Sequence, residues 1–351
     1  MTTPRVSILL PNLNQRAFLE ERLATIRDQT FGDWELIIID SFSDDGSWEF
    51  LRDYAAADPR ITATQAPRDG IYPNWNRCLE KARGEFVYFA TSDDTMTPDF
   101  LAEMVAALDR HPDCQLAQCC LQAIDEHGAV IPGWWKLTGA ARFLGSDYLQ
   151  PHLRRAPYDG VLHCVMHTIY HSITQLLIRR TTFTRTGPFP TGYGPGGDFS
   201  WGLKAGLTCD VVHVPKFMAT WRIHGAQASG PYRENATERA LMVRMVDDAL
   251  RELPPRRGET KLPTEPLRFA YIYDYFRHAF AEAPSHGKKL ALLIRLIGTE
   301  PRAAAAALGR AVTGRRRNFD KPAYARRLLR RFGLENHFVP LPGPAGTPPS
   351  P

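Results

Sequence analysis

Short apolar runs alternate with amphipathic helical segments through the first 125 of the chain's 351 residues. The segments between these runs carry apolar residues at helical spacing. A run such as ELIIID is apolar on both faces, which is typical of a parallel strand covered by helices on each side. Repeated β-α-β units of this length predict a doubly wound α/β sheet. Its strands are expected at residues 6–10, 35–40, 61–65 and 86–90.

Polar and acidic residues collect where three of these strands end. Pro11 to Asn14 follow the first strand, Asp40 and Ser41 close the second, and Ser92 to Asp94 follow the fourth. Parallel strands bring their carboxyl ends to one edge of the sheet, and ligands bind beyond that edge. We therefore expect the functional site there.

The composition excludes several other classes of protein. With 44% hydrophobic and 23% charged residues, the chain can fill a real core and is not disordered, collagenous or coiled-coil. It has no apolar stretch of ~20 residues that could span a membrane. We see no signal-peptide pattern, and the six cysteines form no CxxC pair. These features predict a cytoplasmic protein with buried thiols.

The second half of the sequence is less regular. A Gly/Pro-rich loop at 187–197 precedes a helix that begins near Phe199, and a pair of strands is expected over 210–223. From Pro231 onward the sequence predicts helices. We expect a catalytic domain over 1–230, a helical, basic extension over 231–339 and a disordered tail over 340–351.

Positive charge is concentrated near the end of this extension. Between His286 and Arg331 there are thirteen Lys or Arg residues and only two acids, whereas the whole chain carries +5. Cationic and apolar residues together suit a helix that lies on the anionic inner face of the cell membrane. A solvated face of a helical subdomain would have the same composition. No recognised nucleic-acid-binding motif accompanies the charge.

Four elements in order resemble a family 2 glycosyltransferase of GT-A fold. They are VSILLPNLN, ELIIIDSFSDDGS, the stretch from DGIYPNWN to TSDD, and GGDFSWGLKAG with WRIHGAQAS. The resemblance covers roughly residues 5–230. It implies a doubly wound mixed sheet and an inverting transfer of a sugar from a nucleotide-diphosphate donor, with UDP favoured, to an acceptor hydroxyl. The acceptor would be a carbohydrate or lipid-linked, in bacterial polysaccharide or glycolipid assembly.

The resemblance also implies a divalent cation, Mg²⁺ or Mn²⁺, on the donor diphosphate. Hard cations of this kind prefer oxygen ligands. The family's Asp-x-Asp motif is here Thr91-Ser92-Asp93, so Asp93 would hold the metal, Ser92 would face the donor, and the first acid is missing. His224 would join the metal or the diphosphate. The same Ser92-Asp93-Asp94 run could instead cap the following helix.

The remaining donor contacts are implied in the same way. Asp40 would accept a ring N–H of the nucleobase, and Pro11 and Asn14 would begin the nucleotide cradle. Asp69 matches a donor-side position of one branch of the family, and Arg222 matches a motif that closes over the diphosphate. Asp40, Asn14 and Asp69 are also residues that commonly form turns.

An inverting displacement needs one base for the acceptor's proton and no enzyme nucleophile. Asp198, in Gly197-Asp198-Phe199, matches the family's base. Gly197 replaces the usual preceding acid, which leaves a single carboxylate. An N-cap aspartate after a glycine-rich loop is the alternative.

Two further clusters have less specific patterns. His163, His167 and His171 would share one helical face, where they could line the acceptor pocket or pack as a polar stripe, and zinc binding is disfavoured because no HExxH glutamate accompanies them. Trp134 and Trp135 suit either a sugar-stacking platform or core packing.

Two other functions remain open at this level. A nucleotidyltransferase would share the α/β sheet, but PNLNQRAF lacks the Gly-rich, Arg-containing loop expected after its first strand. A non-catalytic sugar- or nucleotide-binding relative would explain the departures at Thr91 and Gly197.

Overall fold

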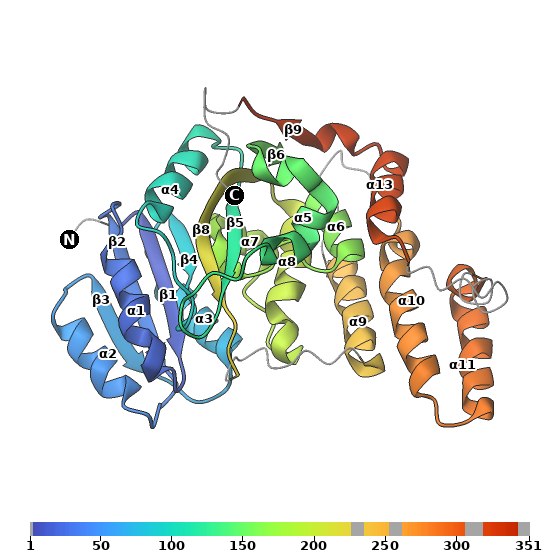
Figure 1. The fold of residues 1–351 in the computed structure, drawn as a ribbon, viewed down its shortest axis with the longest axis horizontal. Coiled ribbons are helices and arrows are strands. Elements are labelled where there is room, and N and C mark those ends of the chain that lie inside the picture. The colour runs from blue at the N-terminus through green and yellow to red at the C-terminus, as the bar shows by residue number, and fades with distance from the viewer. Residues whose placement is uncertain (1–2, 226–234, 253–261, 306–318, 343–351) are drawn as a thin grey trace.

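A mixed sheet of nine strands runs through the molecule, in the order β3-β2-β1-β4-β7-β5-β8-β6-β9 (Figure 1). The structure is a computed structural model, and it describes residues 3–225, 235–252, 262–305 and 319–342. The strand count and all other counts refer to these residues.

The first four strands confirm the predicted parallel half of the sheet. They are β1 (Val6–Asn12), β2 (Trp34–Asp40), β3 (Ile61–Gln65) and β4 (Phe86–Phe89). All three neighbouring pairs are parallel, and the register places Asn12 beside Asp40 and Asp40 beside Gln65. The strand ends that were expected to carry the site therefore lie along one edge.

Helices cover both faces of this half. Alternate residues of a strand face opposite sides of a sheet, so Ile8 and Ile38 join one core cluster while Leu9 and Ile37 join the other. The first cluster includes buried residues of α1 (Arg16–Arg27), α2 (Ser47–Ala56) and α4 (Phe100–Arg110), and the second includes those of α3 (Ile71–Lys81).

The prediction of two strands over 210–223 is wrong. One long strand, β8 (Val211–Arg222), runs parallel to β5 (Leu116–Ile124) and antiparallel to β6 (His152–Arg154). Its register with β5 shifts twice, so that Cys119 lies beside Val214 but Cys120 lies beside Phe217. Pro215 falls in this irregularity, where its missing N–H costs no ladder hydrogen bond. The proline thus marks a bulge in a continuous strand.

Strand β7 (Leu176–Arg179) lies between β4 and β5 and is antiparallel to both. Short helices fill the remainder of the region between residues 134 and 208. They are η1 (Trp134–Leu137), α5 (Gly139–Leu144), η2 (Gly145–Leu149), α6 (Tyr158–Met166), η3 (Ile173–Gln175), η4 (Arg180–Thr182), α7 (Phe183–Thr186), η5 (Gly194–Gly196) and α8 (Gly197–Thr208).

The C-terminal part is helical and packs on the body. It comprises α9 (Ala236–Glu252), α10 (Thr264–Glu282), α11 (His286–Thr299), α13 (Lys321–Arg331) and η6 (Glu335–His337), followed by β9 (Phe338–Pro340), which pairs with β6. Buried residues of α9, α10 and α13 share a core cluster with α6 and α8, while α11 lies at the outer end of the molecule (Figure 1). The expected boundary near residue 230 falls outside the described residues. The tail was expected over 340–351, but Pro340 ends β9 and the N–H of Leu341 donates to the Pro151 carbonyl at 2.9 Å, while residues 343–351 fall outside the described residues. In the described part of the chain, no helix has the length and apolar character needed to cross a membrane.

Two glycines allow α6 and α8 to approach closely. A Cβ atom on Gly206 would lie 2.7 Å from the backbone nitrogen of Gly160, and one on Gly160 would lie 2.8 Å from the backbone nitrogen of Leu207. Backbone atoms cannot move aside as the end of a side chain can. These positions therefore fix the place of α8, which carries Asp198 in its first turn.

Gly206→Ala should lower the free energy of unfolding by about 1–3 kcal/mol, because the added methyl group overpacks a backbone contact. Denaturant unfolding monitored by circular dichroism measures the change. Gly298→Ala is the matched control, since Gly298 also lies near the end of a helix but has open space around its Cα. It should leave stability unchanged or raise it by up to about 1 kcal/mol. Equal effects at the two positions would contradict the close approach.

Candidate active site

Helix α3 is hydrogen-bonded to the three segments that carry Asp40, Asp93 and Asp198. The hydroxyl of Tyr72 lies 3.0 Å from Oδ1 of Asp198, Nδ2 of Asn74 donates to Oγ of Ser41 at 2.7 Å, and Nε1 of Trp75 donates to the Ala90 carbonyl at 3.1 Å. All three α3 side chains are buried. The ends of β2 and β4 and the start of α8 are thereby assembled around one helix.

Asp40 organises the loop that follows β2. Its carboxylate accepts bonds from Nδ2 of Asn12 at 2.8 Å, from the backbone N–H of Ser43 at 2.9 Å and from Oγ of Ser43 at 2.6 Å. The side chain is fully buried. In this structure the Asp40 carboxylate therefore accepts hydrogen bonds from protein groups and holds the loop together. The predicted contact with a nucleobase stays a prediction.

The same loop presents an aromatic ring to solvent. Phe42 has a φ of 51° and is 52% exposed, and a bulky side chain rarely adopts this left-handed conformation. Arg68 holds the loop in place by donating to the carbonyls of Ser41 and Phe42 and to the carboxylate of Asp44. Strain that the surrounding structure maintains in this way is common at functional sites.

Asn14 and Asp69 lie at the rim of this edge, each bonded to a protein partner. Asn14 exchanges two hydrogen bonds with Asp44, at 2.7 and 3.0 Å, and so ties the end of β1 to the Phe42 loop. Asp69 accepts a bond from Arg77 of α3 at 2.7 Å, and this guanidinium lowers the pKa of Asp69. Their direct contact with a donor stays a prediction.

The loop after β4 is held between β1 and β8. Oγ of Ser92 donates to the carbonyl of Pro11 at 2.8 Å, and the backbone N–H of Thr95 donates to Oγ1 of Thr220 at 2.8 Å. Asp94 is turned inward and accepts the backbone N–H of Arg222 at 2.8 Å. Burial, together with the nearby Asp93 charge, raises the pKa of Asp94 to about 7. Asp94 thus holds the loop, and Asp93 is left as the candidate ligand.

Asp93 and His224 lie together, as a shared role on a metal requires. Nε2 of His224 is 2.9 Å from Oδ2 of Asp93, and its ring packs on Phe18 with centroids 4.6 Å apart. This separation is that of a hydrogen bond between the two side chains, and it also places both within reach of one shared Mg²⁺ or Mn²⁺, which they would have to separate to bind. The described residues contain no group of three or more His, Cys, Asp or Glu that could hold a metal. A cation here would take its other ligands from the donor and water.

The Arg222 guanidinium is hydrogen-bonded to the segments that surround Asp93. This buried group donates to the carbonyl of Asp93 at 2.6 Å, to those of Asp125 and Glu126, and to the carboxylate of Glu21 at 2.6 Å. It therefore positions the loop that carries Asp93, and its predicted contact with the diphosphate stays a prediction.

Asp198 lies in the first turn of α8, where Tyr72 and the backbone N–H of Phe199 contact its Oδ1 at 3.0 and 2.7 Å. Burial raises the pKa of this carboxyl. Gly197 beside it cannot be an acid here, because a Cβ would lie 2.6 Å from the Pro190 carbonyl and 2.7 Å from the Tyr72 ring. The departure from the family pattern at this position therefore has a steric cause.

The three histidines do not share a helical face. Helix α6 ends at Met166, and His167 has a φ of 76°. His167 stacks on Phe199, whereas His171 packs edge-on between the indoles of Trp134 and Trp221. Burial lowers the pKa of His163 and His167 to about 3. They are neutral packed side chains at physiological pH.

The two adjacent tryptophans separate. Trp134 lies against Trp221, next to Arg222 on β8, with centroids 5.1 Å apart, whereas Trp135 stacks on Tyr148. Of the pair, Trp134 is therefore the one on the side of the candidate site.

Several positioning residues were missed by sequence reasoning: Glu21, Phe42, Ser43, Arg68, Tyr72 and Asn74. Arg68 had a usable signal, because it follows the third strand at the same edge of the sheet as the other loops. Glu21 had none, since only the folded chain brings it to Arg222.

The fold is similar to two solved structures of glycosyltransferases. S. aureus TarS in complex with UDP-GlcNAc matches with a TM-score of 0.63 at 14% identity, over 94% of this chain and 92% of that one. A mannosyltransferase from Pyrobaculum calidifontis, in complex with GDP-Man and Mn²⁺, matches with a TM-score of 0.51 at 20% identity, over 95% and 88%. The fold is thus of the GT-A type.

The family model described as glycosyl transferase family 2 matches residues 7–186, about half of the chain. The protein belongs to this family. The putative teichuronic acid biosynthesis glycosyltransferase TuaG of Bacillus subtilis is 34% identical over 103 residues, 29% of this chain and 41% of that protein. The O-antigen biosynthesis protein RfbC of Myxococcus xanthus is 26% identical over 279 residues, 78% of this chain and 20% of that protein. The chain spans less than half the length of these curated relatives.

Arg222→Lys should lower the free energy of unfolding by at least about 2 kcal/mol, because an ammonium group cannot serve four acceptors that are spread around a guanidinium fork. Urea unfolding measures this loss. Arg52→Lys is the control, since Arg52 is 57% exposed and pairs only with exposed Asp53. That change should stay within about 0.5 kcal/mol. A loss at Arg222 as small as that at Arg52 would contradict the framework role.

Proposed function

We propose that this protein is an inverting glycosyltransferase that moves a sugar from a nucleotide diphosphate to an acceptor hydroxyl. The observation that supports this most is the assembly around α3. Its side chains hydrogen-bond to Asp198 and to the loops that carry Asp40 and Asp93. Family membership favours glycosyl transfer over the alternative of nucleotidyl transfer.

The donor is proposed to be a UDP-sugar that lies over the carboxyl ends of β1 and β2. TarS, the neighbour with the higher TM-score of the two, was solved with UDP-GlcNAc. In this proposal Asp40 shapes the loop and the exposed Phe42 ring offers a flat apolar face to the base. Asn14 and Asp69 border the same edge.

Asp93 and His224 are proposed to hold Mg²⁺ or Mn²⁺. When bound, the cation would neutralise the diphosphate as it departs. The chain's contribution is to keep the two ligands in place: Arg222 holds the carbonyl of Asp93, Asp94 is fixed to β8, and Phe18 supports the imidazole.

Asp198 is proposed as the base. The acceptor oxygen forms a bond to the anomeric carbon as the bond from that carbon to the diphosphate breaks, and the acceptor's proton passes to Asp198. The displacement inverts the anomeric centre. A carboxyl whose pKa is raised by burial is a stronger base for this proton than an exposed one.

The acceptor is proposed to be a carbohydrate or a lipid-linked sugar of a bacterial surface polysaccharide. The relatives carry names that refer to teichuronic acid and O-antigen biosynthesis. Trp134 and Trp221, which pack together at the end of β8 that precedes His224, are proposed to contact it.

Three variants separate donor binding from turnover. Thermal shift with UDP, with and without Mn²⁺, should show a stabilised wild type, because a ligand that binds the native state raises the Tm. Asp93→Asn should lose the Mn²⁺-dependent part of the shift, and Phe42→Ala should reduce the UDP shift. Asp198→Asn should keep both shifts but lower donor turnover by roughly 10²–10⁴-fold, measured as UDP release.

Lack of any shift with nucleotide diphosphates would contradict the donor site and leave a non-catalytic sugar-binding relative as the alternative. A shift without turnover by the wild type would favour a non-catalytic nucleotide-binding relative. Full turnover by Asp198→Asn would remove Asp198 from the mechanism without affecting the donor site.

Tyr72→Phe should move the acid limb of the kcat/KM profile to higher pH. Burial already raises the pKa of Asp198, while the Tyr72 hydroxyl lowers it by stabilising the carboxylate. Without that hydroxyl the carboxyl keeps its proton to a higher pH, and a base must be unprotonated to act. Initial rates across the acid range measure the limb.

Tyr193→Phe is the control for this profile. It removes a hydroxyl from the neighbouring loop, where Tyr193 bonds Asp248 and does not contact Asp198. Its acid limb should coincide with that of the wild type. An unmoved limb in Tyr72→Phe would show that another group sets the profile.

A further inference from the structure

Helix α11 combines exposed aliphatic residues with positive charge and has no acidic residue in its fourteen positions. Leu290 is 58% exposed, Ile294 61% and Ile297 48%. Because an α-helix has 3.6 residues per turn, these three positions form one stripe. Leu296 on the other side of the helix is buried against α10.

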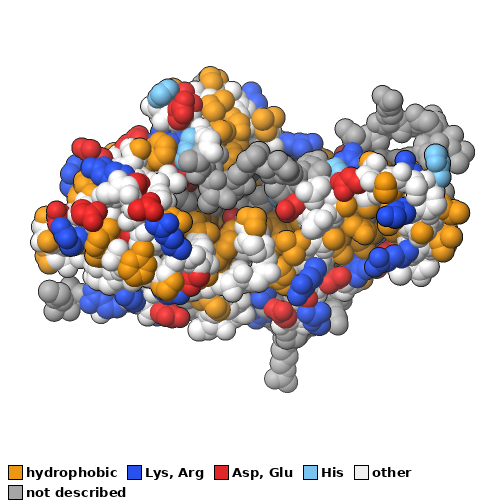
Figure 2. Space-filling model, turned by 90° about the horizontal axis from the view of Figure 1, so that it is seen from below, with side chains coloured by type: hydrophobic (Ala, Val, Ile, Leu, Met, Phe, Trp, Pro, Cys, Tyr) orange, Lys and Arg blue, Asp and Glu red, His pale blue; other side chains and the backbone are white. Residues whose placement is uncertain are grey.

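Exposed apolar residues are unusually dense here. Nine large hydrophobic side chains of the described chain are exposed, and four of them belong to the α10–α11 hairpin, the fourth being Phe280. Lys289 lies over the Phe280 ring at 5.3 Å, so the exposed ring of α10 adjoins the basic edge of α11. Hydrophobic and basic side chains lie together at this end of the molecule, on the right in Figure 2. A contiguous apolar surface of this kind indicates a contact site.

The cations of α11 are available to a partner. Within the described ranges, Lys288, Lys289 and Arg295 form no ion pair, whereas Glu300 and Arg302 just beyond the helix are paired with α10. From Leu290, Lys289 lies about 100° around the helix in one direction and Arg295 about 140° in the other. Lys289 therefore borders the stripe, while Arg295 and, at about 160°, Lys288 lie toward the opposite face of the helix and add to its positive potential. In the sequence from 286 to 318, eight Lys or Arg residues face a single acid.

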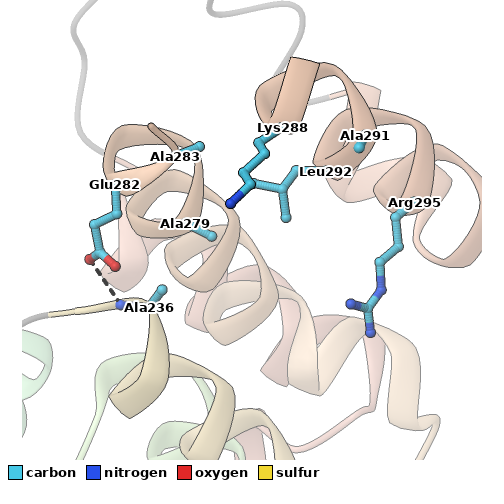
Figure 3. A pocket seen from close by; sticks show the side chains of 8 residues that line it. All are labelled: Ala236, Ala279, Glu282, Ala283, Lys288, Ala291, Leu292 and Arg295. Carbon is cyan, nitrogen blue, oxygen red and sulfur yellow. Dashed lines mark hydrogen bonds between the residues drawn. The ribbon is translucent and has the colours of Figure 1, made fainter. Parts of the chain in front are cut away.

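A cavity of about 440 Å³ opens on the side of α11 that faces away from the stripe, between α10, α11 and the start of α9 (Figure 3). Its walls are apolar, formed by four alanines and Leu292, while Lys288 and Arg295 project at its border. The one acid there, Glu282, already accepts the backbone N–H of Ala236 at 3.0 Å. The charge left at the cavity is positive.

We propose that the α10–α11 hairpin docks on an anionic lipid bilayer. Leu290, Ile294 and Ile297 enter the boundary between headgroups and acyl chains, and Lys289 reaches the lipid phosphates. Lys288 and Arg295, on the face behind the stripe, strengthen the attraction of the helix to the anionic surface. Long basic side chains extend from a buried stem to charged headgroups in this way. A second copy of the chain would bring like charges together on this face, so a lipid surface is the better partner.

This surface is independent of the proposed catalytic site. Helix α11 contributes no residue to the edge that carries Asp40, Asp93 and Asp198 and is at the outer end of the molecule (Figure 1). Membrane binding and donor binding can therefore be measured separately.

Vesicle co-sedimentation of the full chain tests the proposal. Vesicles of phosphatidylglycerol and phosphatidylcholine should bind the protein at low salt and release it at high salt, and vesicles of phosphatidylcholine alone should bind it weakly. Leu290→Ser/Ile294→Ser/Ile297→Ser and, separately, Lys288→Gln/Lys289→Gln/Arg295→Gln should each lower the partition coefficient by on the order of 10- to 100-fold. Both should keep the wild-type UDP thermal shift, which also shows that they fold.

Two control variants match these changes. Arg110→Gln/Arg142→Gln/Arg185→Gln removes the same charge from exposed positions elsewhere, and Leu137→Ser removes another exposed aliphatic side chain. Both should bind like the wild type within about 3-fold. Failure of the wild type to bind anionic vesicles, or equal losses in matched and control variants, would overturn the proposal. The proposal would also be overturned if light scattering showed the wild type to be an oligomer and the triple serine substitution made it monomeric without lowering vesicle binding.

Discussion

Helix α3 is the part of the structure on which the candidate site depends. Four side chains within five residues of its first half hydrogen-bond to four separate segments: Tyr72 to Asp198, Asn74 to Ser41, Trp75 to Ala90, and Asn76 to both backbone groups of Phe189. Each bond is at least partly buried, so a lost partner would leave an unsatisfied polar group in a region of low dielectric constant. These bonds therefore fix the strand ends, the glycine-rich loop and Asp198 relative to one another. A displacement reaction requires such fixed relative positions, because misplacement of the reacting groups by about 1 Å can cost 10²-fold in rate.

The sequence was sufficient to predict the parallel half of the sheet and the edge that carries the site. Apolar runs locate the strands, and parallel pairing follows from the helices between them, so Asp40 and Asp93 had to lie at the same edge. What these carboxylates bond to could not be predicted. The partner of Asp94 is 128 residues away on β8, and Arg222 reaches Glu21 across 201 residues. Local patterns describe one element at a time, whereas such pairs exist only once distant elements have packed.

The errors in the second half have the same origin. A proline within an apolar run suggests an interruption, yet β8 continues through Pro215 because β5 pairs with it across a shifted register. Helical spacing placed three histidines on one face, but the left-handed backbone of His167 ends the helix and sends His171 toward Trp221. The steric need for Gly197 was also hidden, since the Tyr72 ring that excludes a side chain there comes from 125 residues earlier. In each case tertiary packing overrode the local preference.

Charge at the site supports the proposed need for a cation. A nucleotide diphosphate brings several negative charges to an edge that already carries the carboxylates of Asp40, Asp93 and Asp198. The arginines described there are neutralised by the protein itself: Arg68 by Asp44, Arg77 by Asp69 and Arg222 by Glu21. These pairs hold loops in place. Their carboxylates are 40–69% exposed, so the cost of releasing an arginine to the donor would come from the loop that it holds and not from an unpaired carboxylate. A divalent ion between Asp93, His224 and the diphosphate would supply the positive charge without dismantling that framework. Thr91 stands where the family's Asp-x-Asp motif has its first acid. With one carboxylate fewer, the protein would neutralise less of the cation's charge, and more of that charge would act on the diphosphate.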